Sequence, residues 1–111
     1  MSSRSLVERR LSGLGDRLRA LRGELAVTDE QLAVLADEAG DLRLRSLVSE
    51  TALAERDHRD AERHAEAMRR HRSELLLEIA GIEAEQDRLL DRLLDAQAGT
   101  GPEPSARRPG P

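Results

Sequence analysis

A heptad pattern of leucine and alanine constrains the fold of this 111-residue chain more than any other feature. From Val7 to Leu42, apolar residues recur at alternating intervals of four and three positions, and Thr28 is the one polar member of the series. The series then changes phase and resumes in a second frame, beginning with Leu44 and Leu47. A mean spacing of 3.5 residues is typical of helices packed along a shared seam. The sequence therefore predicts an all-α coiled coil.

The two frames predict two helices joined by a turn, in an antiparallel two-helix coiled-coil hairpin. We expect a disordered N-terminus over 1–5, a hairpin over 6–97 and a disordered tail rich in proline and glycine over 98–111. Within the hairpin, helices over 6–48 and 52–97 flank a turn at 49–51, where Thr51 would cap the second helix. Ser5 and Glu8 form a possible capping box at the start of the first helix. A turn near Gly40 is the competing position.

A turn near residue 50 would place residue i across from residue 100 − i, and the apolar residues then face one another. This register brings Leu25 to Leu75 and Leu18 to Ile82, whereas a turn at Gly40 would oppose Leu25 to an arginine. The predicted seam residues are Leu11, Leu14, Leu18, Leu21, Leu25, Leu32, Leu35, Leu42, Leu75, Ile79, Ile82, Leu89 and Leu93.

Charge supports the same folding back. Residues 1–23 hold six arginines and two acids, whereas 77–98 hold six acids and two arginines. Residues 24–41 hold six acids and no arginine, and 59–76 hold five arginines and four acids. Opposite charges beside a seam favour one orientation of the helices. An antiparallel dimer of unbroken helices would satisfy the same charge pattern and is the alternative architecture.

Composition excludes several classes of protein. The absence of Phe, Tyr and Trp, with 36% charged residues, indicates long solvated helices rather than a compact globule. Without cysteine, neither a disulfide nor a thiolate metal site can form. No apolar run approaches the roughly 20 residues of a membrane span, so we expect a cytoplasmic protein. All eighteen basic residues are arginine, which is typical of a GC-rich genome such as that of an actinobacterium.

A second set of apolar residues lies off the seam. A two-helix hairpin buries little surface for its length, so pairing into a four-helix bundle would gain stability. We expect a homodimer, together with binding of a protein partner whose identity the sequence does not give. The candidate partner surface consists of Val27, Val34, Leu76, Leu90 and Leu94.

Functional side chains concentrate between residues 56 and 72. The pairs Asp60/His64 and His58/Glu62 have helical spacing, but neither matches a zinc motif and arginines surround them, so no metal site is predicted. The planar guanidinium groups of the arginines could donate paired hydrogen bonds to an anion. The net charge of −4 and the lack of aromatic rings argue against binding of nucleic acid. The possible anion-contact residues are Arg63, Arg69, Arg70 and Arg72.

Polar residues within the seam suggest a structural role. Thr28, His58, Arg72 and Gln86 take core-facing positions, where polar side chains commonly fix register or oligomeric state. No catalytic residues or cofactor site are predicted, because the chain has no glycine-rich phosphate loop and two helices enclose no cleft.

Two known families resemble this chain. Its architecture resembles the cyclic-di-GMP-binding helical anti-sigma factors of actinobacteria, whose motif reads Glu-x3-Ser-x2-Arg-x3-Gln-x3-Asp. Glu8 and Ser12 match that motif, but Gly15, Arg19 and Gly23 replace its arginine, glutamine and aspartate. A long hairpin with Glu50 near its tip also resembles the coiled-coil finger of transcript-cleavage factors, although we expect no counterpart of their second globular domain within these 111 residues.

Taken together, the residues predict a non-catalytic interaction or scaffolding protein that self-associates and binds a protein partner. The alternative is a regulatory hairpin that acts on the transcription machinery, in an anti-sigma-like way or on RNA polymerase, or that binds an anionic nucleotide through its arginines.

Overall fold

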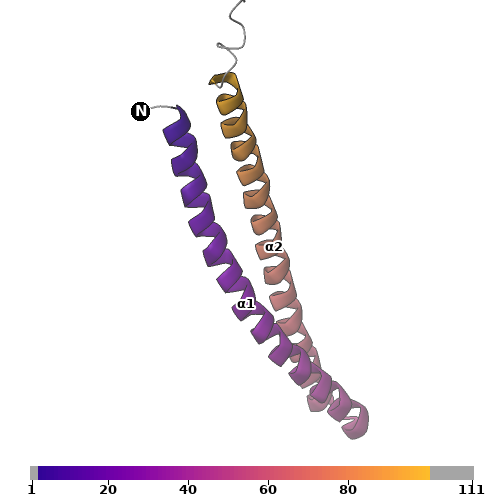
Figure 1. Ribbon diagram of the computed structural model, residues 1–111. Helices are drawn as coiled ribbons and strands as arrows, with labels where there is room; N and C mark the ends of the chain where they lie inside the picture. The colour runs from indigo at the N-terminus through magenta and orange to yellow at the C-terminus, as the bar shows by residue number, and fades with distance from the viewer. Residues whose placement is uncertain (1–2, 101–111) are drawn as a thin grey trace, which may run out of the picture. The chain divides into compact units, whose positions relative to one another are not determined.

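Two long helices make up the hairpin in the computed structural model, which describes residues 3–100 and the side chains of 3–98. Helix α1 spans Ser3–Ser49 and helix α2 spans Ala52–Thr100 (Figure 1). The predicted all-α helical hairpin is confirmed. The chain divides into two units, each containing a stretch of both helices. We name Met1–Arg19 with Ala80–Pro111 the terminal unit, and Ala20–Ile79 the turn unit.

The helices extend beyond the predicted bounds at both ends of the chain. Helix α1 begins at Ser3, so Ser5 lies inside the helix and the proposed capping box with Glu8 is wrong. Glu8 instead accepts a hydrogen bond of 3.3 Å from Nε of Arg4, one turn earlier. Helix α2 continues to Thr100, through the first residues of the predicted tail. The remainder of that tail lies outside the described residues.

The turn consists of Glu50 and Thr51, so α1 runs through Gly40 without a break. Glu50 has a φ of 51°, and its N–H donates to the carbonyl of Ser46 at 3.1 Å. This left-handed residue closes the C-terminus of α1. Thr51 caps α2 as predicted, since its Oγ1 accepts a hydrogen bond of 3.1 Å from the N–H of Ala54.

Replacing Glu50 by glycine should stabilise the hairpin by about 0.5–1 kcal/mol, because a side chain disfavours the left-handed conformation and glycine removes that strain. Glycine also makes the unfolded chain more flexible, which limits the gain. Chemical denaturation followed by circular dichroism measures the difference. Val48→Gly, at an exposed helical position, is the control and should lower the stability. A loss of stability in Glu50→Gly would show that its backbone is not strained.

The seam of the terminal unit is apolar apart from Gln86. Val7, Leu14 and Leu89 form a buried cluster, against which Leu11, Ile82 and Leu93 pack. This grouping fits the predicted register, in which positions 7 and 93 face each other, as do 11 and 89. Leu18 is also buried, and Gln86 is half-buried.

The seam of the turn unit contains more alanine and more polar residues. Its most buried large side chain is Leu21, at 1% exposure. The other buried seam residues are Thr28, Ala39, Ala61, Ala65, Leu75 and Ile79. The half-buried ones are Leu25, Leu32, Leu35, Leu42, Ser46, Ala54, His58, Met68 and Arg72. Along α1 the four-and-three spacing therefore continues from Leu42 to Ser46 and ends only at the turn.

The sequence predicts that the heptad frame shifts after Leu42. Within the first helix this prediction is wrong. Leu44 and Leu47 were expected in the second frame, yet both are 63% exposed. They belong to α1, whose own frame continues to Ser46, and a turn is needed before the chain can enter a new frame. The second frame begins in α2, where Ala54 is its first half-buried member.

Candidate functional site: the faces beside the helix seam

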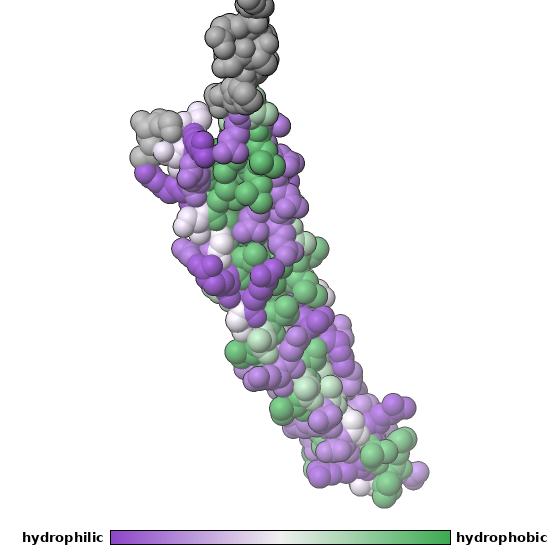
Figure 2. Space-filling model, viewed as in Figure 1, coloured by the Kyte–Doolittle hydropathy of each residue, from purple (hydrophilic) through white to green (hydrophobic). Residues whose placement is uncertain are grey.

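Apolar side chains reach the surface on both helices, interleaved with polar ones (Figure 2). All five residues of the candidate partner surface are exposed, from Leu76 at 39% to Val34 at 66%. Leu90 and Leu94 lie in the terminal unit, while Val27, Val34 and Leu76 lie in the turn unit. Leu6, which shares the off-seam heptad position of Val27 and Val34, is 53% exposed as well. Five further apolar residues are exposed without a predicted surface role: Leu44, Leu47, Val48, Leu53 and Leu77.

A bidentate ion pair joins the two helices of the terminal unit. Nε and Nη2 of Arg10 donate to the two carboxylate oxygens of Glu85, at 2.9 and 3.1 Å. The hydrogen bonds from Arg10 lower the pKa of Glu85, and those to Glu85 raise the pKa of Arg10. Both residues directly precede seam positions, so opposite charges flank the seam here as an antiparallel arrangement requires.

Two further polar contacts join the helices in the turn unit. Nε2 of His71 lies 3.1 Å from a carboxylate oxygen of Glu24. Nε of Arg72, a seam residue, donates to Oδ1 of Asp29 at 2.6 Å. Arg72 therefore extends from the seam to the surface rather than placing its charge between the helices. This contact ties a polar seam position to one residue of the facing helix, as a register-setting role requires.

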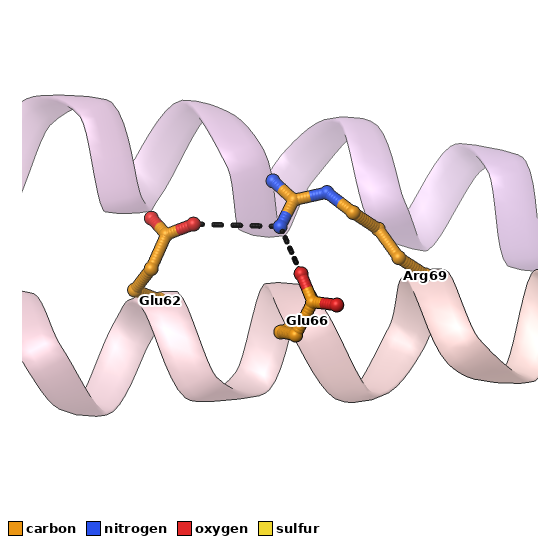
Figure 3. A network of polar contacts seen from close by, with 3 residues as sticks. All are labelled: Glu62, Glu66 and Arg69. Atoms are coloured by element: carbon orange, nitrogen blue, oxygen red, sulfur yellow. Dashed lines mark hydrogen bonds and ion pairs between the residues drawn. The ribbon is translucent and has the colours of Figure 1, made fainter.

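Three of the four predicted anion-contact arginines are held by carboxylates. Arg69 reaches Glu66 at 2.9 Å and Glu62 at 3.4 Å, and these hydrogen bonds raise its pKa (Figure 3). Arg63 pairs with Asp60 one turn earlier, and Arg72 pairs with Asp29. The four arginines also occupy three different heptad positions and do not converge on one spot. An anion would have to displace these carboxylates, so the structure offers no preformed anion site at these residues.

Neither a metal-binding cluster nor a membrane-spanning helix is found in the part of the chain that the structure describes. Residues 3–98 contain no group of three or more His, Asp or Glu placed to hold a metal ion. Neither α1 nor α2, over the residues described, has a stretch apolar enough to span a bilayer.

One side of the turn unit contains a groove that the sequence analysis missed, formed by three adjoining hollows. The first two, of about 480 and 520 Å³, share Gln31, Leu35 and Met68. The third, of about 290 Å³, shares His64 with the first. We name the combined feature the acidic groove; its residues are Glu30, Gln31, Val34, Leu35, Glu38, Leu42, Asp57, Asp60, Ala61, His64, Ala67, Met68 and His71.

No signal within either helix alone identifies the acidic groove. Its residues come from one flank of both helices, and only the register brings that flank together. In sequence terms, it combines the acidic stretch 24–41 with small residues of α2 such as Ala61 and Ala67.

Comparison with known proteins gives no relative on which to base a function. No protein-family model matches the chain, and neither a curated protein nor a solved structure shows significant similarity to it.

Proposed function

We propose that this chain is a non-catalytic interaction module that self-associates through its terminal unit, as a homodimer with a four-helix core. The observation that supports this most is the pair Leu90 and Leu94, 48% and 62% exposed, on one face of α2. Residues four apart lie on the same side of a helix, so the two leucines form one continuous apolar surface. Covering it would gain on the order of 1.5–3 kcal/mol for each fully buried side chain.

The charges of the terminal unit favour a second copy as the occupant. Its α1 stretch, residues 3–19, holds five arginines and two acids, while its α2 stretch, residues 80–98, holds five acids and two arginines. A two-fold axis parallel to the helices would set α1 of one copy beside α2 of the other. Every neighbouring pair of helices would then be antiparallel and of opposite charge, which suits a four-helix bundle.

The test is the oligomeric state, measured by analytical ultracentrifugation over a range of concentrations. The unaltered chain should be dimeric, and Leu90→Glu/Leu94→Glu should weaken dimerisation at least roughly tenfold, because it places four charges at the interface. Both residues are exposed in the hairpin, so helix content should remain.

Leu77→Glu is the matched control. Leu77 is 74% exposed on the same helix but lies on the side farthest from the seam, so its replacement should leave the dimer intact. A monomer at every concentration, or a dimer unaffected by the double replacement, would refute the proposal.

A further inference from the structure

The acidic groove has an apolar floor that the helices do not cover. Leu35 and Met68 are seam residues, yet they remain half-buried and line the two larger hollows. Beside them, Val34 is 66% exposed. The neighbouring seam positions Ala39, Ala61 and Ala65 are buried. Their short side chains leave the larger residues beside them accessible from one side.

The rim of this groove is acidic. Glu30, Glu38, Asp57 and Asp60 line the hollows, and no arginine is among the lining residues. Asp60 also pairs with Arg63, which lies outside the groove. The stretch of α1 that forms one wall, residues 24–41, carries six acids and no arginine. An apolar floor between carboxylates matches a ligand with an apolar stripe and positive flanks.

Like charges meet across the groove at its smallest hollow. Glu38 of α1 and Asp57 of α2 line the same space, whereas Arg10 pairs with Glu85 and Arg72 with Asp29 elsewhere between the helices. Two carboxylates that line one hollow repel each other, which disfavours the hairpin unless a cation lies near them. A positively charged ligand would remove this repulsion and would so be favoured at this position.

We infer that the acidic groove binds a basic amphipathic helix of another protein. A helix suits the site because the hollows adjoin one another along the hairpin, and an apolar stripe at i, i+3, i+4 and i+7 can follow them. A lone metal ion does not suit it, since the floor is apolar. The basic stretch of a second copy is a poorer occupant, because its Leu11, Leu14 and Leu18 already pack in their own seam. This surface lies in the turn unit and does not depend on the dimer proposed above.

Two synthetic probe peptides of about 18 residues, or five helical turns, test the inference. Both carry the same leucine stripe, with arginines flanking it in one and glutamates in the other. Fluorescence anisotropy should show that the arginine peptide binds the full chain, more weakly as salt rises, and that the glutamate peptide does not. Equal binding of the two peptides, or no binding of the arginine peptide, would overturn the inference.

Variants of the full chain then locate the site. Glu30→Arg/Glu38→Arg should weaken binding at least roughly tenfold by reversing the rim charge, and Val34→Ser should weaken it about three- to tenfold by removing an apolar contact. Glu55→Arg/Glu66→Arg makes the same change of charge in the turn unit, where neither residue lines the acidic groove, and should have little effect at moderate salt. Circular dichroism verifies that each variant is folded.

Three results would count against the inference. Equal losses in both charge-reversed variants would mean a non-specific attraction, and an unaffected Val34→Ser would mean that the groove floor is not used. If Glu30→Arg/Glu38→Arg abolishes self-association of the chain without peptide, then a second copy covers the groove. That last result would also contradict self-association through the terminal unit alone, whereas the first two results leave the Leu90/Leu94 test unaffected.

Discussion

Replacing Leu21 by alanine should lower the free energy of unfolding by about 2–5 kcal/mol, the largest loss expected from any single truncation in this chain. Leu21 is only 1% exposed, and the register sets it across from Ile79, which is also buried. Removal of its branched end leaves a cavity that two long helices can close only by shifting along the whole seam. Because small domains have little stability in reserve, this loss should be visible as a lower denaturation midpoint.

Urea denaturation followed by helical circular dichroism measures this effect. All samples should have the same protein concentration, because self-association would shift the apparent stability. Leu77→Ala is the matched control: Leu77 is 74% exposed, so its truncation should change stability by less than about 0.5 kcal/mol. Equal effects at the two positions would mean that the hairpin does not pack along the described seam.

Replacing the polar layer Thr28 and Arg72 by leucine should raise the free energy of unfolding by about 2–4 kcal/mol. Thr28 is buried and Arg72 is half-buried, so leucine at both positions would bury more apolar surface. The gain at each position is less than the about 1.5–3 kcal/mol of a fully buried leucine, because the threonine methyl and the arginine methylenes are already partly buried. The lost contact from Arg72 to Asp29 lies at the surface and offsets about 0–1 kcal/mol of this.

The same double replacement should reduce the uniqueness of the assembly. A polar layer disfavours shifted registers and other oligomers, and a uniform leucine seam does not. Sedimentation should therefore show a broader distribution of species, alongside a higher denaturation midpoint. Arg70→Leu, at an exposed position nearby, is the control and should give neither effect. A less stable double variant would show that the polar layer stabilises the hairpin outright.

Much of the fold follows from the sequence because the heptad spacing acts directly on helix packing. The seam leucines of α1, the turn at residue 50 and the cap at Thr51 were all predicted from local patterns. The assignment of Leu44 and Leu47 to the second seam frame is wrong. Their spacing matches the heptad frame of α2, but both residues belong to α1. Val48 and Leu53, beside the turn, show the same limit: their hydrophobicity gives no information about burial at a hairpin tip.

The candidate surfaces were less predictable because they depend on pairs of residues distant in sequence. Arg10 and Glu85 are 75 positions apart, and only the exact register makes them partners. The acidic groove likewise needs Glu38 and Asp57 to line one hollow. The sequence also suggests that the arginines between residues 56 and 72 are free to bind an anion. Their pairing with nearby acids such as Glu66 depends on side-chain conformation, which the sequence alone does not give.

The symmetric register about residue 50 also has a consequence for how the chain folds. Contacts near the turn, such as those around Ser46 and Ala54, close loops of only a few residues, whereas Val7 and Leu93 must close a loop spanning most of the chain. Since closing a longer loop costs more entropy, the earliest contacts should form beside the turn and then spread toward the two termini. Pairing of the two helices is thus expected to begin beside Glu50 and Thr51 and to proceed one heptad at a time toward the chain ends.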